Sequence, residues 1–238
     1  MAIDINRIFS GLLLIASVLL CYVLNFDYLI LISLVLFTIY DLKISRFICN
    51  SIDYLILIIF MLAVPIIYHY IEFIIILNIL LISCILLNIF FSSFFFKKIF
   101  FISIFIFILN FYSIFLINRD YLYFIIFVAF FNDTIAYISG KSIKGPLIIP
   151  SISPNKTWSG TIISFCLTLL VIYQYNVNFF ISILLSISLF FGDIFFSYIK
   201  RKFNLKDFSS LLKGHGGILD RLDSMFFFTI ILNFYYLI

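Results

Sequence analysis

Long apolar runs separated by short polar breaks make up most of this chain. A membrane β-barrel would need alternating apolar and polar residues in segments of about ten, but the runs here are continuous. A helix that crosses a bilayer needs about 20 apolar residues, within a range of about 17–25. The pattern therefore predicts an all-α, polytopic membrane protein with about nine spans, at residues 8–24, 28–40, 54–68, 73–91, 99–117, 121–139, 157–175, 179–199 and 222–238.

The positive charges give this arrangement an orientation. Cytoplasmic loops of membrane proteins carry an excess of Lys and Arg. With the N-terminus in the cytoplasm, the nine spans put 14 of the 15 Lys and Arg residues on the cytoplasmic side and leave only Arg119 outside. This asymmetry predicts a cytoplasmic N-terminus and an external C-terminus.

Composition narrows the protein class further. Hydrophobic residues make up 65% of the 238 and charged residues only 11%, whereas a soluble domain carries about 25% charged residues. A soluble enzyme and a disordered chain are both excluded. The four cysteines form no CxxC pair and have no histidine at ligand spacing, so we interpret them as small hydrophobic side chains.

Polar and glycine-rich sequence is confined to the second half of the chain. Seven of the eight glycines follow residue 120, as do two long cytoplasmic loops, 140–156 and 200–221. We therefore expect two regions: helices in 1–120 that act as a lipid-facing scaffold, and a catalytic transmembrane region in 121–238. Loops of this kind commonly carry function.

Two acidic residues, Asp133 and Asp193, stand inside apolar runs. Each precedes the first lysine of the next cytoplasmic loop by about two helical turns, which places both about 10 Å inside the cytoplasmic end of a helix. A carboxylate in a span is costly and suggests function, and this pair predicts a metal or cation site open to the cytoplasm. The alternatives are structural carboxylates satisfied by polar neighbours, and a proton or ion pathway.

The loop 200–221 ends in a dense polar motif. His215, Gly216 and Gly217 precede Asp220-Arg221-Leu222-Asp223. Asp220 and Asp223 are three residues apart and share a helical face. A Gly-Gly turn can cradle phosphate, and carboxylates beside phosphate-binding cations suggest a shared magnesium ion. An acidic helix cap, and a basic loop that only sets topology, are the simpler alternatives.

A second polar segment begins the span at 157–175. Lys156 and Thr157 can meet phosphate at a helix N-terminus. Trp158, taken alone, is typical of an anchor at the membrane interface.

These residues carry a family resemblance. The stretch 197–223, SYIKRKFNLKDFSSLLKGHGGILDRLD, resembles the signature of phosphatidate cytidylyltransferases (CDP-diacylglycerol synthases), which runs S-x-x-K-R, four residues, K-D, then H-G-G-x-x-D-R-x-D. The stretch 132–160 is similar to the second region of that family. Three positions depart from the family pattern: Ile135, Phe196 and Lys213 stand where Gly, Glu and Pro are usual.

The resemblance implies that CTP and phosphatidic acid form CDP-diacylglycerol and pyrophosphate, with magnesium as cofactor. It implies a metal site of Asp193, Asp220 and Asp223, and leaves room for a second, monovalent cation whose binding Phe196 would weaken. The resemblance also implies catalytic roles for Lys200, Arg201, Lys206, Asp207, His215 and Arg221. It implies substrate-binding roles for Asp133, Lys156, Thr157, Ser197, Gly216 and Gly217.

The same resemblance predicts where the protein works and with what. We expect an integral protein of a bacterial inner membrane, with lipid around its helices, an active site that faces the cytoplasm and no nucleic-acid partner. The sequence does not specify the oligomeric state, so both a monomer and a homodimer are compatible with it.

Two other functions compete with this one. A CTP-dependent polyprenol or lipid kinase would share nucleotide, metal and membrane, but it needs a base for its hydroxyl nucleophile, and the full signature argues against it. A small transporter that uses the two intramembrane carboxylates should show internal repeats, whereas the polar residues here gather in one half of the chain.

Overall fold

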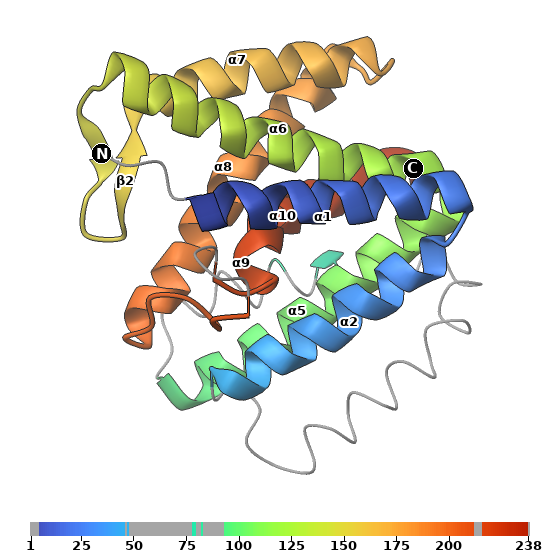
Figure 1. Ribbon diagram of the computed structural model, residues 1–238, viewed down its shortest axis with the longest axis horizontal. Coiled ribbons are helices and arrows are strands. Elements are labelled where there is room, and N and C mark those ends of the chain that lie inside the picture. Colours follow the sequence, from blue (N-terminus) through green and yellow to red (C-terminus); the bar gives the residue numbers. More distant parts are fainter. Residues whose placement is uncertain are drawn as a thin grey trace. The chain divides into compact units, whose positions relative to one another are not determined.

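The computed structural model describes residues 5–45, 47, 78, 79, 82, 93–211 and 216–237, and helices dominate this part of the chain (Figure 1). The predicted spans 54–68 and 73–91 lie outside the described residues, apart from 78, 79 and 82, and so does His215. The helices are α1 (Ile5–Leu24), α2 (Asp27–Ile44), α5 (Ser93–Ile117), α6 (Arg119–Ile143), α7 (Trp158–Gln174), α8 (Phe179–Lys202), α9 (Leu219–Leu222) and α10 (Met225–Leu237).

The predicted helical membrane class agrees with these elements. Within the described part, three helical stretches are long and apolar enough to cross a membrane: Ile99–Ile117, Arg119–Ile143 and Phe179–Lys202. The last predicted span, 222–238, differs in detail, because the chain turns at Asp223 and Ser224 between α9 and α10.

The chain divides into two compact units. The first comprises residues 1–117, 208–219 and 237–238, and the second comprises 118–207 and 220–236. The division after residue 117 lies close to the predicted boundary at 120. The segment 208–219, however, packs with the first unit although it follows α8 in the chain.

In the first unit, α2 packs against α1 and α5. The ring of Phe208 joins the segment 208–219 to this unit. It stacks on Phe100 with ring centroids 5.9 Å apart and contacts Phe47 with ring centroids 6.0 Å apart. Buried polar groups here bond to each other. Asn78 and Asn110 exchange two side-chain hydrogen bonds of 2.9 and 2.7 Å.

In the second unit, α6 and α7 lie along each other (Figure 1). Two glycines allow this close approach: a β-carbon at Gly160 would lie 3.2 Å from the Cα of Gly140, and one at Gly140 would lie 2.8 Å from Oγ1 of Thr157. Missing side chains at a helix crossing let the two backbones come together. Helix α7 also packs against α8.

The loop predicted at 140–156 is an ordered connection. Helix α6 continues to Ile143, and a two-stranded antiparallel hairpin follows, β1 (Leu147–Ile149) and β2 (Ser153–Thr157). The backbone N–H of Trp158 donates to the carbonyl of Pro146, and the hydroxyl of Ser159 donates to the carbonyl of Lys144 at 2.7 Å. These bonds close the hairpin against the start of α7, so Lys156 is held in a defined place.

Candidate active site

The second unit contains a pocket of about 720 Å³ in which the predicted polar residues converge. Its lining comes from α6, the end of β2, α7, α8, and the segment from α9 to the turn that follows it. Four carboxylates and two cationic side chains line it: Asp133, Asp193, Asp220, Asp223, Lys156 and Arg221. Residues up to 90 positions apart thus share one pocket, as the sequence predicted for Asp133 and Asp193.

One ion pair joins the hairpin to α8. Nζ of Lys156 donates to Oδ2 of Asp193, and the two side chains are 24% and 16% exposed. The same ammonium group lies 5.6 Å from the ring centroid of Phe190, on the preceding turn of α8. A carboxylate at this depth needs a positive partner, and Lys156 supplies one from another element.

A second ionic cluster lies at the end of α8. Nζ of Lys200 is 2.7 Å from Oδ1 of Asp220 and 3.9 Å from Oδ2 of Asp223. Lys200 is only 9% exposed, so the ammonium group is largely removed from water. A buried lysine needs such partners, because desolvation disfavours its charged form. The spacing of three residues between Asp220 and Asp223 allows both carboxylates to reach one cation.

The carboxylates also act on one another. The negative charges of Asp193 and Asp133 repel the negative charge of Asp223. The charge of Asp193 also repels that of Asp133. Lys156 and Lys200 offset this repulsion at Asp223. The pocket therefore concentrates acidic charge, which Lys156, Lys200 and Arg221 partly offset.

Gly192 explains how Asp223 comes so near to α8. A β-carbon at this position would collide with the carbonyl oxygen of Asp223 and lie 2.9 Å from that of Ser224. The turn between α9 and α10 thus rests directly on the backbone of α8, one residue before Asp193. The Gly-Asp step at 192–193 is the sequence signal that could have identified this packing role.

The start of α7 combines capping with a place in the pocket. Oγ1 of Thr157 accepts a hydrogen bond from the N–H of Gly160 at 3.2 Å, so Thr157 is the N-cap of α7. Thr157 and Trp158 both line the pocket, and the Trp158 side chain is 50% exposed. The hydroxyl predicted to meet phosphate is therefore already bonded to its own helix.

The lining of the pocket also includes apolar side chains of α7 and α8, among them Ile162, Phe165, Ile187, Phe190 and Phe191. Phe191 and Ile162 are exposed. The pocket therefore combines charged and apolar side chains.

Several predicted site residues lie outside this lining. Arg201 is exposed, and its Nε donates to the carbonyl of Ile152 at 3.2 Å, which ties the end of α8 to the hairpin turn. Lys206 and Asp207 are exposed, and Ser197 is half-buried on α8. Gly216 and Gly217 belong to the first unit, where Gly217 is buried.

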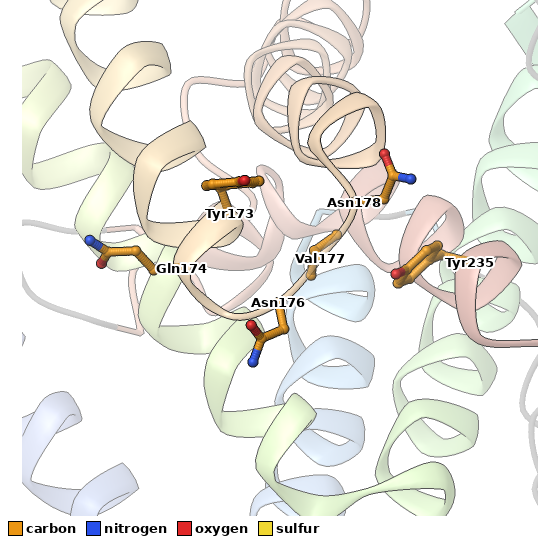
Figure 2. Close-up of a pocket in the computed structure, with 6 residues that line it drawn as sticks. All are labelled: Tyr173, Gln174, Asn176, Val177, Asn178 and Tyr235. Atoms are coloured by element: carbon orange, nitrogen blue, oxygen red, sulfur yellow. The ribbon is translucent and has the colours of Figure 1, made fainter.

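A second hollow of about 550 Å³ lies at the turn between α7 and α8 (Figure 2). Figure 2 shows the side chains of Tyr173, Asn178 and Tyr235 around Val177. No charged side chain is part of its lining, which is completed by Gln174 and Asn176. Without an acid, a base or a cation, this hollow carries none of the predicted chemistry.

The oxygen donors of the main pocket suit a hard cation. Mg²⁺ prefers carboxylate oxygens and binds through one or two of them plus substrate phosphates. Within the described residues no three Asp, Glu, His or Cys side chains converge on one ion position. The donor chemistry thus fits a magnesium ion that takes its remaining ligands from a substrate, with the lysines supplying positive charge beside it.

Sequence reasoning missed three contributors to this site. Asn132 is buried next to Asp133 and lines the pocket, and Tyr137 lies one turn further along the same lining. Gly192 sets the approach of the α9–α10 turn. Asn132 has a local signal, because it immediately precedes an intramembrane aspartate, whereas Tyr137 stands out in no way among fifteen tyrosines.

Comparison with known proteins agrees with this geometry. A sequence profile of the cytidylyltransferase family matches residues 5–238. The chain is 40% identical over 116 residues to a phosphatidate cytidylyltransferase of Rickettsia conorii, a match that covers 42% of this chain and 50% of that protein. It is 40% identical over 123 residues to one of Staphylococcus aureus, which covers 48% of this chain and 47% of that protein.

The matched region thus spans about half the length of each of these curated relatives. The family profile, in contrast, extends over almost all of the chain. On this match, the chain belongs to the cytidylyltransferase family.

Proposed function

We propose that this protein is a phosphatidate cytidylyltransferase, which joins CTP to phosphatidic acid and releases pyrophosphate. The observation that carries the proposal is one pocket whose lining combines four carboxylates and two cationic side chains with apolar side chains. Such a pocket suits one water-soluble polyanion and one anionic lipid, and it lies in a member of the cytidylyltransferase family. The names of the relatives point to the same substrates.

The reaction needs no general base. A phosphate oxygen of phosphatidic acid is already ionised at neutral pH, and it attacks the α-phosphorus of CTP. The new P–O bond forms as the bond from that phosphorus to the bridging oxygen breaks, and pyrophosphate leaves with the electron pair. Catalysis then depends on positioning and on neutralising charge, as in other transfers at phosphorus.

The lysines and Arg221 are suited to that neutralisation. Lys156 and Arg221 line the pocket. Lys200 lies near Asp220 and Asp223, which also line it. A phosphate group that enters would compete with the carboxylates for these cations. Thr157 and the hairpin would hold Lys156 just before the start of α7, while the apolar lining residues of α7 and α8 would accept acyl chains.

Magnesium is part of this proposal. One or two of the expected ligands Asp193, Asp220 and Asp223 would hold it, with substrate phosphates as the other ligands. The mutual repulsion of Asp193 and Asp223 supports a cation between them. When bound, it would polarise phosphoryl oxygens and stabilise the leaving pyrophosphate. Activity should be lost in excess chelator and return with added magnesium.

The decisive experiment measures pyrophosphate release by the purified protein in detergent micelles. CTP with phosphatidic acid should give pyrophosphate and CDP-diacylglycerol in equal amounts. A polyprenol in place of phosphatidic acid should give no product, and release of CDP from CTP with that alcohol would favour the kinase instead. Absence of any CTP-dependent product, together with ion flux in vesicles, would favour the transporter.

The proposal includes a topology. Nine spans with a cytoplasmic N-terminus and an external C-terminus would open the pocket to the cytoplasm of a bacterial inner membrane. Reporter fusions near residues 45, 97, 148 and 210 should then read cytoplasmic, and those near 70, 119 and 176 external. A cytoplasmic signal at the C-terminus would contradict this topology.

A further inference from the structure

A buried carboxylate in the first unit holds the segment that leads into Asp220. Asp41 lies near the C-terminal end of α2 and is 0% exposed. Its Oδ1 accepts a hydrogen bond of 2.6 Å from the hydroxyl of Ser209, and its Oδ2 accepts one of 2.7 Å from the backbone N–H of Leu219. One side chain thus binds both ends of the segment 208–219.

Gly217 is shaped to this carboxylate. A β-carbon at position 217 would lie 2.6 Å from Cγ of Asp41 and collide with its oxygens. Gly216, by contrast, has a φ of +75°, which side chains rarely adopt. The two glycines of the motif are therefore required for different reasons, Gly216 by its backbone conformation and Gly217 by the approach of Asp41.

The contact bears on the active site through the chain itself. Asp41 binds the N–H of Leu219, and Leu219 immediately precedes Asp220 in the chain. Asp220 in turn forms an ion pair with Lys200. Hydrogen bonds to a charged group are stronger than those between neutral groups. A carboxylate can accept both bonds at once, whereas an alanine at position 41 can accept neither. An asparagine is a poorer probe, because its amide could still accept from the Leu219 N–H and donate to the Ser209 hydroxyl.

We propose that Asp41 is a positioning residue of this enzyme, which anchors the segment 208–219 and so sets where Asp220 and Arg221 begin. The inference rests on the proposed function for its effect on turnover, while the anchoring itself does not depend on any substrate. It would give the helices of the first unit, which the sequence suggests only as scaffold, a direct part in shaping the catalytic motif.

The first test measures amide hydrogen exchange in peptides that span Gly216–Leu222. In Asp41→Ala the exchange of the Leu219 amide should rise at least about tenfold, the factor expected for losing a single strong hydrogen bond. The matched control is Asp27→Ala, the same change at another buried aspartate of α2, which should leave these peptides unchanged. Equal exchange in Asp41→Ala and the unaltered protein would overturn the anchor.

The second test asks whether anchoring matters for turnover. In Asp41→Ala, kcat per folded molecule should fall about tenfold or more. The KM for phosphatidic acid should stay the same, because among the described residues no member of 208–219 lines the pocket. A higher exchange of Leu219 with an unchanged kcat would overturn the positioning role. Where Asp41→Ala does not fold, Ser209→Ala removes one of the two bonds to Asp41 and should give a smaller change of the same kind.

A double variant separates this role from a general loss of stability. Gly217→Ala should raise the exchange of Leu219 and lower kcat by itself. When it is combined with Asp41→Ala, the collision disappears, so the double variant should be no worse than Asp41→Ala alone. Multiplied effects would mean that Gly217 acts independently of Asp41, which contradicts the proposal.

These readouts keep two failures apart. A chain that makes no CDP-diacylglycerol, yet shows the predicted exchange at Leu219 and the predicted coupling of Asp41 with Gly217, would contradict the proposed function and leave the anchor standing. A chain that makes the product but lacks these exchange effects would overturn the anchor alone.

Discussion

Carboxylates in both units have defined partners, but only those of the second unit line a described pocket. In the first unit, Asp41 is fully buried and accepts hydrogen bonds from a hydroxyl and a backbone N–H of the segment 208–219. In the second unit, Asp193, Asp220 and Asp223 face the ammonium groups of Lys156 and Lys200. These three carboxylates line a pocket of about 720 Å³.

This difference separates groups that hold structure from groups that can exchange partners. A backbone N–H bound to a carboxylate is part of a fixed turn. A lysine that lines a pocket can move to a phosphate, and its carboxylate can then bind a cation. The presence of a buried acid is therefore a weak guide to chemistry, and its place in the lining of a pocket is a better one.

The largest expected effect is on turnover, at Asp193. Asp193→Asn should lower kcat by at least about a thousandfold, because it removes a negative charge worth several kcal/mol to a metal-assisted transfer. The protein should still insert, since losing a buried charge favours insertion. The measurement is pyrophosphate release at saturating magnesium and CTP.

The control for Asp193 is Asp207→Asn. Asp207 is exposed and outside the pocket lining, so its loss should reduce activity far less. Near-native turnover in Asp193→Asn, with an inactive Asp207→Asn, would move the chemistry from the pocket to the loop.

The next effect is on stability, at Lys200. Lys200→Met should lower the free energy of unfolding in detergent by about 3–5 kcal/mol, because it leaves Asp220 and Asp223 buried without their cation. Lys202→Met is the matched control: Lys202 lies 5.8 Å from the ring centroid of Tyr198, a contact worth no more than about 1 kcal/mol. Equal losses of unfolding free energy in both variants would show that Lys200 does not neutralise Asp220 and Asp223.

A smaller effect is expected in the first unit, at Asn110. Asn110→Ala breaks the paired amides of Asn78 and Asn110 and should cost about 1–2 kcal/mol of unfolding free energy. The kcat per folded molecule should not change, because this pair only holds helices together. Ser103→Ala is the control on the same helix, since its hydroxyl bonds only within α5, to the carbonyl of Phe100. A loss of kcat in Asn110→Ala would blur the contrast between the units.

The smallest effect concerns Thr157, a hydroxyl in the pocket that acts as a helix cap. Thr157→Ala should lower the unfolding free energy by about 1 kcal/mol, the usual cost of losing an N-cap. Thr157→Ser keeps the capping oxygen and should restore most of it. If Thr157→Ser were stable but bound CTP much more weakly, the threonine would contact substrate as well as cap α7.

The sequence by itself was sufficient for the features that depend on local spacing. Apolar run lengths predicted helices long and apolar enough to cross a membrane, as α5, α6 and α8 are. The interval from Asp220 to Asp223 predicted that the two carboxylates lie on one face, and in the structure both lie near Lys200. Helix periodicity and hydrophobic length act over a few turns, so neighbouring residues determine them. The motif in 197–223 likewise needs no long-range contact to be recognised.

Only the tertiary structure decided which distant groups meet. Lys156 and Asp193 are 37 residues apart, and Asp41 and Ser209 are 168 apart. The approach of the α9–α10 turn to Gly192 is likewise invisible in the order of residues. Pairings across such separations depend on how the helices pack, and that packing results from many weak contacts spread over the whole unit. The sequence therefore determined which charges the site contains, and the packing of the helices decided which of them became partners.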